Sequence, residues 1–505
     1  MLSLLDLPPE ILSLIIQHTI PIGFEAIALS CKTTYAASAH FQSQYHLRRK
    51  RFRNFKFSHE IGKSPGIIPE PDSAECWDEV TQETGICITT ARGLLEHIAQ
   101  DLSVAEYIHL IELNLDEYEE DENVQNSLRP EIPETLKELV RKSPIISAVG
   151  GNPEDWMEGI RYSIIDADIF LLTLLSQVRG LALRQMWNDL DPDYNRDISE
   201  KPHLWPVVNK ISEWANNPTE FPHAPLSKLS IIHSYAPSGY EEKVSLTPYT
   251  PFMAINSVSE VDLTSAVLLD DGYTGYAFNP RWDSYSPNLR KLVLNASVAG
   301  PEEIEQLLSR IPNLEIFEFS HETKWHGCGF NWNPAFFLDT VQDVCAGTLK
   351  ELSVFVQDPS QWPEGPEVVL MDMTRFEKLA VLELDVDMLC GTKYDKSMQY
   401  DGVEPEDDEE DVGPAWPKLV EMLPASIEEV KLRLNSFMDE DLECISHTVE
   451  GLEDSRATKL PHLKKLGLFV CAQDDPLPEK ALESLGAAKR CGFSIWKSFS
   501  SVPLL

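Results

Sequence analysis

A short apolar pattern recurs along most of the chain: an apolar residue, two variable positions, a second apolar residue, one variable position and a third. Its ten occurrences begin at Ile108, Val178, Leu226, Val258, Leu289, Leu314, Leu349, Leu379, Ile427 and Leu463. The last two apolar positions alternate with variable ones, as in a strand that buries one face. Each occurrence therefore predicts a short strand.

Helical patterns lie between several of these strands. Residues 301–311 and 334–344 begin with a proline and continue with apolar residues at helical spacing, and a similar pattern covers 482–488. Strand, turn and helix repeated in one direction predict parallel strands joined by right-handed crossovers. The sequence therefore predicts an α/β fold whose units stack into an irregular solenoid with a curved parallel sheet.

The spacing of these strands resembles that of leucine-rich repeats. Successive strands are 25 residues (Leu292 to Phe317) to 70 residues (Ile111 to Leu181) apart, mostly longer than the ~20–29 residues of regular repeats. The Asn or Cys that follows the last aliphatic position of such repeats occurs only as Asn435 and Cys471. A Rossmann-like or other α/β sheet is the alternative, but no glycine-rich phosphate-binding motif follows any of these strands.

The N-terminal residues follow a different pattern. Pro8 and Pro9 favour the start of a helix, which then carries an aliphatic stripe at helical spacing, formed by Ile11, Leu12, Ile15 and Ile16. A break at residues 21–23 precedes a second helical stretch from Phe24 to Tyr35. Two short helices with so much aliphatic surface cannot bury it alone, so we expect them to need a partner.

This stretch resembles an F-box, whose pattern is Leu-Pro-x-Glu-Ile-Leu, a run of aliphatic residues and a later Cys-Lys/Arg-x-x-Tyr/Trp element. The matching segments are 7–12 and 31–35, although a clear Leu-Trp end is lacking, which bears on affinity. The resemblance implies docking on a Skp-type adaptor, and through it on a cullin–RING ligase. The side chains implied to face the adaptor are Leu7, Pro8, Ile11, Leu12, Ile15, Ile16, Leu29 and Cys31.

The composition excludes several classes of partner. The chain has 82 acidic and 42 basic residues, a formal net charge of −40, so nucleic acids and anionic membranes would be repelled. No apolar run approaches the length of a membrane span. Nine cysteines without a Cys-x-x-Cys pair, in a chain without a cationic leader, predict reduced thiols and a cytoplasmic and/or nuclear location.

We expect three parts: an F-box at 1–46, a connecting helix and linker at 47–100, and a leucine-rich-repeat-like domain at 101–505. The basic segment 47–53 is interpreted as a helix that closes the F-box, with a nuclear import signal as the alternative. Residues 64–77 have the composition of a linker. The acidic run 404–411 lies in an insertion at 400–415 that we expect to be solvated.

No catalytic, metal or cofactor site is predicted. His321, His326 and Cys328 lie close in sequence but have no second ligand pair at a suitable spacing, so a buried or loop-stabilising role is favoured. Asp166 and Asp168 have no neighbouring His or glycine-rich loop and are interpreted as strand-edge or helix-cap acids.

Together the two resemblances imply a non-enzymatic substrate receptor of a Skp–cullin–F-box ubiquitin ligase, whose repeats bind a protein substrate. Strand residues between the buried aliphatic positions should form the substrate surface. Its charge is expected to be segregated into acidic Glu383 and Asp385 and a basic group of Lys431, Arg433, Lys464 and Lys465. The alternatives are a repeat scaffold with an N-terminal segment that binds something else or caps the first repeat, and an α/β enzyme.

Overall fold

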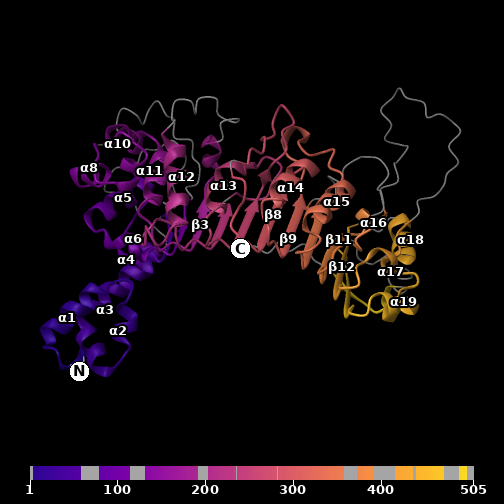
Figure 1. Ribbon diagram of the computed structural model, residues 1–505, viewed down its shortest axis with the longest axis horizontal. Coiled ribbons are helices and arrows are strands. Elements are labelled where there is room, and N and C mark those ends of the chain that lie inside the picture. Colours follow the sequence, from indigo (N-terminus) through magenta and orange to yellow (C-terminus); the bar gives the residue numbers. More distant parts are fainter. Residues whose placement is uncertain are drawn as a thin grey trace. The chain divides into compact units, whose positions relative to one another are not determined.

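The protein is a mixed α/β structure built on parallel strands (Figure 1). The computed structural model describes residues 4–57, 79–113, 131–190, 203–234, 236–280, 282–357, 372–390, 416–435, 439–470 and 488–497. Within these ranges no helix combines the length and the apolar character that a membrane span requires. The chain forms two compact units, Met1–Tyr235 with Pro251–Val258, and Ala236–Thr250 with Ser259–Leu505.

The first unit begins with a small helical module. Its elements are η1 (Leu4–Asp6), α1 (Pro9–His18), α2 (Phe24–Ala28) and α3 (Lys32–Phe52). The predicted second helical stretch is thus two helices, and the longer α3 provides a surface on which α1 and α2 can pack. The module therefore has a small core of its own, formed by Leu12, Ile16, Phe24, Ala28 and Tyr45. The rings of Phe24 and Tyr45 lie 4.4 Å apart in this core.

Helix α3 continues past the predicted domain boundary at residue 46 and leads into the first strand of the sheet. That strand, β1 (Asn54–Lys56), pairs in parallel with β2 (Leu110–Glu112). Arg51, near the end of α3, donates to the carbonyl oxygens of Ile86 (2.9 Å) and Lys56 (3.0 Å). A strand thus lies in the range 47–100, where we expected only a helix and a linker. Residues 64–77 lie outside the described ranges.

The rest of the first unit alternates helices with parallel strands. Strands β1, β2, β3 (Gly180–Leu183) and β4 (Ile231–Ser234) are neighbours in that order. The accompanying helices are α4 (Glu79–Thr84), α5 (Ala91–Gln100), α6 (Ser103–Tyr107), α8 (Glu134–Arg141), α9 (Pro144–Ala148), α10 (Pro153–Tyr162), α11 (Ile164–Leu172), η2 (Gln185–Leu190) and α12 (Leu204–Ala215). A short helix, α13 (Thr250–Met253), lies almost wholly in the first unit and follows the 3₁₀ turn η4 (Thr247–Tyr249) of the second unit in the sequence.

Helix α11 is buried from Ile165 to Leu172, and it carries Asp166 and Asp168 inside. The Asp168 carboxylate lies 3.0 Å from Arg184 Nε, and Asp166 Oδ1 lies 2.8 Å from His203 Nε2. Burial raises the pKa of Asp168 to about 6, although Arg184 acts in the opposite direction. Asp168 is therefore a buried ion-pairing group and not the strand-edge or helix-cap acid that the sequence suggested. Asp166 is buried in the first turn of α11, close to the cap position that the sequence suggested, and contacts His203.

In the second unit the strands again pair in parallel with their neighbours. Their order is β6 (Glu260–Thr264), β8 (Lys291–Ser297), β9 (Ile316–His321), β10 (Glu351–Val356), β11 (Val381–Asp385), β12 (Glu429–Leu434), β13 (Lys465–Val470) and β14 (Phe493–Lys497). A separate parallel pair consists of β5 (Val244–Ser245) and β7 (Ala266–Val267). The helices are α14 (Pro301–Leu308), η5 (Trp325–Gly327), α15 (Pro334–Cys345), α16 (Asp387–Cys390), α17 (Leu419–Met422), α18 (Asp439–Thr448) and α19 (Leu452–Lys459).

The predicted α/β class with a large parallel sheet is confirmed. Each of the ten predicted strand positions contains or leads into a strand, although β4 starts only at Ile231 because Leu226 adopts a left-handed turn conformation (φ 55°). The helices expected after Pro301 and Pro334 are α14 and α15, and Asn333 caps α15 by accepting the backbone N–H groups of Ala335 and Phe336. The helix expected at 482–488 and the acidic insertion at 400–415 are not covered by the described residues, apart from Ala488.

Alternate strand residues pack on these helices to form the core of the second unit. The rings of Phe319 in β9 and Phe337 in α15 lie 4.4 Å apart. His321 ends β9 and stacks on Trp332 with 4.5 Å between ring centroids, and burial lowers its pKa to about 3.

The cysteines are only in part the reduced thiols that the sequence predicted. Cys328 and Cys345 are buried free thiols, and burial raises the pKa of each to about 12. Cys31 and Cys491 are also free. Cys87, in the first unit, and Cys444, in the second, however, each take part in a disulfide bond and are not free thiols.

The buried pair between Asp168 and Arg184 predicts a large and asymmetric effect of mutation. Asp168→Ala leaves a buried guanidinium without its counter-ion, so the free energy of unfolding should fall by roughly 3–5 kcal/mol. The double variant Asp168→Leu with Arg184→Met should lose much less, because no charge stays unpaired. Urea unfolding measures both, with Lys142→Ala in the exposed pair to Glu138 as the control. A single variant as stable as the wild type would contradict the prediction.

His321 predicts a loss of stability in acid. Its folded pKa of about 3 lies below the ~6.5 of a free histidine. Below pH 6.5 the unfolded chain therefore binds a proton that the folded chain does not, and stability should fall by about 1.4 kcal/mol per pH unit towards pH 3. The buried carboxyls Asp168 and Asp385 act in the opposite sense, because their folded pKa values are raised to about 6.

The contribution of His321 is therefore isolated by comparison with His321→Phe, which keeps a ring on Trp332 but cannot bind a proton. Urea unfolding between pH 4 and 7 should show a flatter acid side for this variant. The exposed-residue variant His462→Gln serves as the control. Identical pH profiles for His321→Phe and the wild type would refute the assignment.

Candidate functional site

The helical module presents an exposed aliphatic surface, although its composition differs from the predicted one. Of the eight predicted adaptor-facing residues, Ile11, Leu29 and Pro8 are exposed, with 44% of Ile11 and 73% of Leu29 accessible. Leu7, Ile15 and Cys31 are partly buried. Leu12 and Ile16 are only 3% and 0% exposed, because they lie on the side of α1 that packs into the module's own core. These two residues are therefore corrected from partner contacts to core residues.

Further aliphatic side chains extend this surface, and the sequence reasoning missed them. We define the apolar surface of the module as the exposed residues Leu4, Leu5, Ile11, Leu14, Ile22 and Leu29. Ile11 and Leu14 are three residues apart on α1 and so share one face of that helix. Apolar residues at helical spacing lie on two sides of α1, one with Leu12 and Ile16 and one with Ile11 and Leu14. Spacing alone does not show which of the two sides packs on α3 and which stays exposed.

Cys31 has a local structural role at the start of α3. Its backbone N–H donates to Thr34 Oγ1 (3.2 Å), and its Sγ lies 3.4 Å from the same hydroxyl. The hydrogen bonds to Thr34 lower the pKa of the Cys31 thiol. The Cys-Lys-Thr-Thr segment therefore fits the requirement for a helix N-terminus, whose first N–H groups need acceptors.

The predicted substrate residues lie on adjacent strands, but their charges alternate and are not segregated. The ladder places Glu383 beside Lys431 and Asp385 beside Arg433. Lys431 Nζ lies 3.7 Å from Glu383 Oε2. Lys464 Nζ lies 2.7 Å from Glu428, the residue before β12, and Lys465 Nζ lies 2.9 Å from Glu429, the first residue of β12. The basic group is thus neutralised by its neighbours, and the predicted charge segregation is wrong.

Asp385 is not a surface residue at all. Its side chain is fully buried, its Oδ2 accepts the backbone N–H of Val356 (2.7 Å), and its Oδ1 lies 3.7 Å from Arg433 Nε. Burial raises the pKa of Asp385 to about 6, while Arg433 acts to lower it. The guanidinium of Arg433 also lies over the ring of Phe355, 3.8 Å from its centroid. Asp385 and Arg433 therefore join β10, β11 and β12 and do not form a free binding site.

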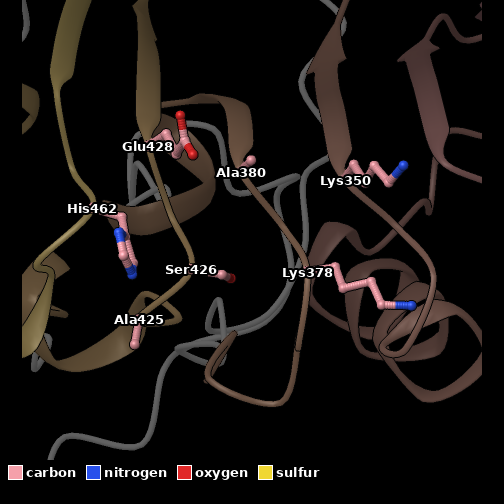
Figure 2. Close-up of a pocket in the computed structure, with 7 residues that line it drawn as sticks. All are labelled: Lys350, Lys378, Ala380, Ala425, Ser426, Glu428 and His462. Carbon is pink, nitrogen blue, oxygen red and sulfur yellow. The ribbon is translucent and has the colours of Figure 1, made fainter.

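A shallow depression of about 550 Å³ lies where β10 to β13 begin (Figure 2). It is lined by Lys350, Lys378, Ala380, Ala425, Ser426, Glu428 and His462. Figure 2 shows the side chains of Lys350 and Lys378 extending away from His462. Ser426 Oγ donates to the carbonyl of Leu379 (2.8 Å), and Lys350 and Glu428 are paired with Glu315 and Lys464. These side chains do not converge as a nucleophile and its base would.

His321, His326 and Cys328 do not come together as metal ligands. His321 stacks on Trp332, the Cys328 thiol is buried, and the His326 ring lies 4.2 Å from that of Trp325. In the part of the chain that the structure describes, no group of three or more His, Cys, Asp or Glu side chains is placed to hold a metal ion. The arrangement agrees with the buried and loop-stabilising role that the sequence favoured.

A scan against models of known protein families and a search of curated proteins found no match to this chain. The functional argument therefore depends on the geometry and chemistry of the chain itself.

The pair between Asp385 and Arg433 predicts that charge reversal here destabilises the fold. Arg433→Glu would place a second carboxylate beside a buried one, so the free energy of unfolding should fall by about 3 kcal/mol. Lys465→Glu, at an exposed position of the same sheet, should change stability much less. Thermal and urea unfolding of the two variants provide the measurement. Equal stabilities would show that Asp385 does not need its counter-ion.

Proposed function

We propose that this chain is the substrate receptor of a Skp–cullin–F-box ubiquitin ligase, a non-enzymatic adaptor that works in the cytoplasm and/or the nucleus. The observation that carries the proposal is the apolar surface of the helical module, in a segment whose sequence resembles an F-box. In this interpretation the module docks on a Skp-type adaptor, and ubiquitin transfer is catalysed by other subunits.

The amount of exposed aliphatic surface supports a permanent partner for the module. Scattered single apolar residues are normal on protein surfaces, but concentrated groups of them mark interaction sites. Here six exposed leucine and isoleucine residues lie between Leu4 and Leu29. Burial of each such side chain stabilises a complex by roughly 1.5–3 kcal/mol. Several of them together are sufficient for a specific interface.

The parallel strands support a binding role for the rest of the chain. In each unit, strands separated by helices or longer segments pair in parallel in sequence order. This order is typical of repeat proteins, which use extended surfaces to bind other proteins. The repeats of this chain resemble leucine-rich repeats in their strand spacing. We therefore propose that the repeats hold a protein substrate while the helical module holds the adaptor.

The alternative is a repeat scaffold in which the helical module only caps the first strand. The end of α3 does contact that region, since Arg51 donates to Lys56 and the rings of Phe52 and Phe55 stack 6.4 Å apart. A cap alone, however, would bury the aliphatic side chains of the module, and Ile11 and Leu14 on α1 remain exposed. The exposed surface of α1 favours docking over capping alone.

Adaptor binding should depend on the exposed side chains and not on the buried ones. Ile11→Asp with Leu29→Asp should weaken binding of a purified Skp-type adaptor by at least about 100-fold, because each change removes an apolar contact and introduces a charge. Calorimetry and co-purification measure this, and circular dichroism checks the fold. The matched control is Leu102→Asp, which changes an exposed leucine just before α6 and should bind the adaptor normally.

Ile16→Asp tests the assignment of the core from the other direction. It should unfold the helical module, because it places a carboxylate in that core. Normal adaptor binding by the Ile11 and Leu29 variant, or a wild-type chain that binds no such adaptor, would refute the proposed docking.

A further inference from the structure

The exposed apolar residues of the second unit differ in kind from those of the helical module. Among its described residues, the large hydrophobic side chains that are exposed are all aromatic: Tyr240, Tyr273, Trp325, Phe330 and Phe336. Two of them, Tyr273 and Trp325, lie beside His326. The His326 ring lies 4.2 Å from that of Trp325 and 5.0 Å from that of Tyr273. The backbone N–H of Trp325 donates to the backbone carbonyl of Tyr240 (2.8 Å), which brings the Tyr240 backbone beside this pair. We call Tyr240, Tyr273, Trp325 and His326 the aromatic platform.

The aromatic platform is built from three segments that lie far apart in the sequence. Tyr240 precedes β5, Tyr273 follows β7, and Trp325 follows β9. The last two segments thus leave the carboxyl ends of parallel strands, where α/β folds generally place their ligand sites. Single-sequence reasoning could not bring these segments together, because each contributes only one or two aromatic residues.

A buried lysine holds two of these segments together. Lys324 is fully buried, and its Nζ donates to Gly239 O (2.9 Å), Ser265 Oγ (3.2 Å) and Glu322 Oε2 (2.6 Å). The same Glu322 oxygen accepts the backbone N–H of Gly239 (3.1 Å). All three ammonium protons thus have acceptors, as a buried charge requires. Tyr240 and Trp325 therefore directly follow two residues that are clamped to each other.

The third segment is fixed by an aspartate turn. Asp271 Oδ1 accepts the backbone N–H groups of Tyr273 (2.9 Å), Thr274 (2.6 Å) and Gly275 (2.6 Å). Gly275 permits this tight turn, since a Cβ there would lie 2.0 Å from the carbonyl oxygen of Leu269. The Thr274 hydroxyl donates to Asp271 Oδ2 (2.8 Å), and its Oγ1 also lies 3.2 Å from the carbonyl oxygen of Trp325. The exposed rings thus stand on an ordered backbone, which reduces the entropy lost when a ligand binds.

The exposed charges beside the platform are acidic. Glu241 and Asp270 are exposed next to its segments, and Asp271 lies in its aspartate turn. Of the nearby cations, Lys324 is buried, and Lys243 is 8% exposed, with its Nζ donating to Thr274 O (3.0 Å). The same Nζ lies 5.7 Å from the centroid of the Trp325 ring, so the chain itself already places one ammonium group over this ring. Aromatic faces attract cations, and more so where carboxylates add a negative potential.

We propose that the aromatic platform binds a lysine- and arginine-rich peptide segment of a partner protein. Guanidinium and ammonium groups would stack on Trp325 and Tyr273, and Glu241 and Asp270 would pair with neighbouring cationic side chains. An acidic peptide or a nucleic acid would meet the same rings but would be repelled by these carboxylates and by the chain's charge of −40. The proposal concerns a different surface from the helical module, and it holds whether or not that module binds an adaptor.

The test uses the purified full chain without any adaptor. A fluorescein-labelled peptide of alternating Lys, Arg and Gly should bind in an anisotropy titration, and its affinity should fall with rising salt. Trp325→Ala and Tyr273→Ala should each weaken binding about tenfold, as removal of an aromatic anchor does. Trp325→Phe keeps a ring and should retain most of the affinity. Glu241→Gln with Asp270→Asn should weaken binding and reduce its salt dependence.

Tyr35→Ala, at an exposed tyrosine of the helical module, is the matched control and should bind the peptide as the wild type does. The proposal is overturned if the basic peptide does not bind, or if Trp325→Ala and Tyr273→Ala bind it normally. It is also overturned if a peptide of alternating Glu, Asp and Gly or a single-stranded oligonucleotide binds more tightly. The adaptor-docking variant of Ile11 and Leu29 should still bind the basic peptide, which separates the two proposals.

Discussion

The parallel ladder is the constraint on which the rest of the second unit depends. Backbone hydrogen bonds between neighbouring strands fix their register, so that Leu352 lies beside Phe317 and Leu382, and Val430 lies beside Leu382 and Leu466. Because side chains alternate in a strand, this register places the apolar positions of successive strands in one continuous row. A one-residue shift of any strand would expose that row, so the helices can cover it only in this register.

The same register decides what the polar face can do. Residues that follow each other in a row come from different strands, so a favourable row alternates in charge. In the row that begins the strands, Glu429 lies beside Lys465, and two residues further along the strands Glu383 lies beside Lys431. Like charges directly opposite would destabilise the ladder. A continuous basic surface on these strands would therefore conflict with the pairing of the sheet, which is the physical reason why the expected substrate patch is absent from this position.

The sequence predicted what periodicity controls and missed what depends on contacts between distant segments. Ten strand positions and the helices after Pro301 and Pro334 follow from local spacing. The prediction missed β1, β5, β7 and β14. β1 was missed because three residues are too few to show a period, and Phe55 is the only one of its residues that is buried. Leu12 and Ile16 were assigned to a partner because helical spacing shows that a stripe is apolar but not what covers it. Asp385 followed the strand alternation only in part: it lies at the carboxyl end of β11, where its buried carboxylate accepts a backbone N–H group of β10.

The backbone beneath the aromatic platform carries features that a purely structural loop does not need. A fully buried lysine is costly unless each of its protons finds an acceptor, and Lys324 meets this condition with a carboxylate, a hydroxyl and a carbonyl. His326 adopts a left-handed conformation (φ 59°), as does Ser265 (φ 59°), whose hydroxyl accepts from Lys324, and each non-glycine residue of this kind costs of order 1–3 kcal/mol. A flexible loop at the same place would avoid these costs but would leave Tyr273 and Trp325 free to move. Strain and buried charge are therefore best explained by a need to hold exposed rings in fixed positions, and rings held in this way are suited to binding a partner.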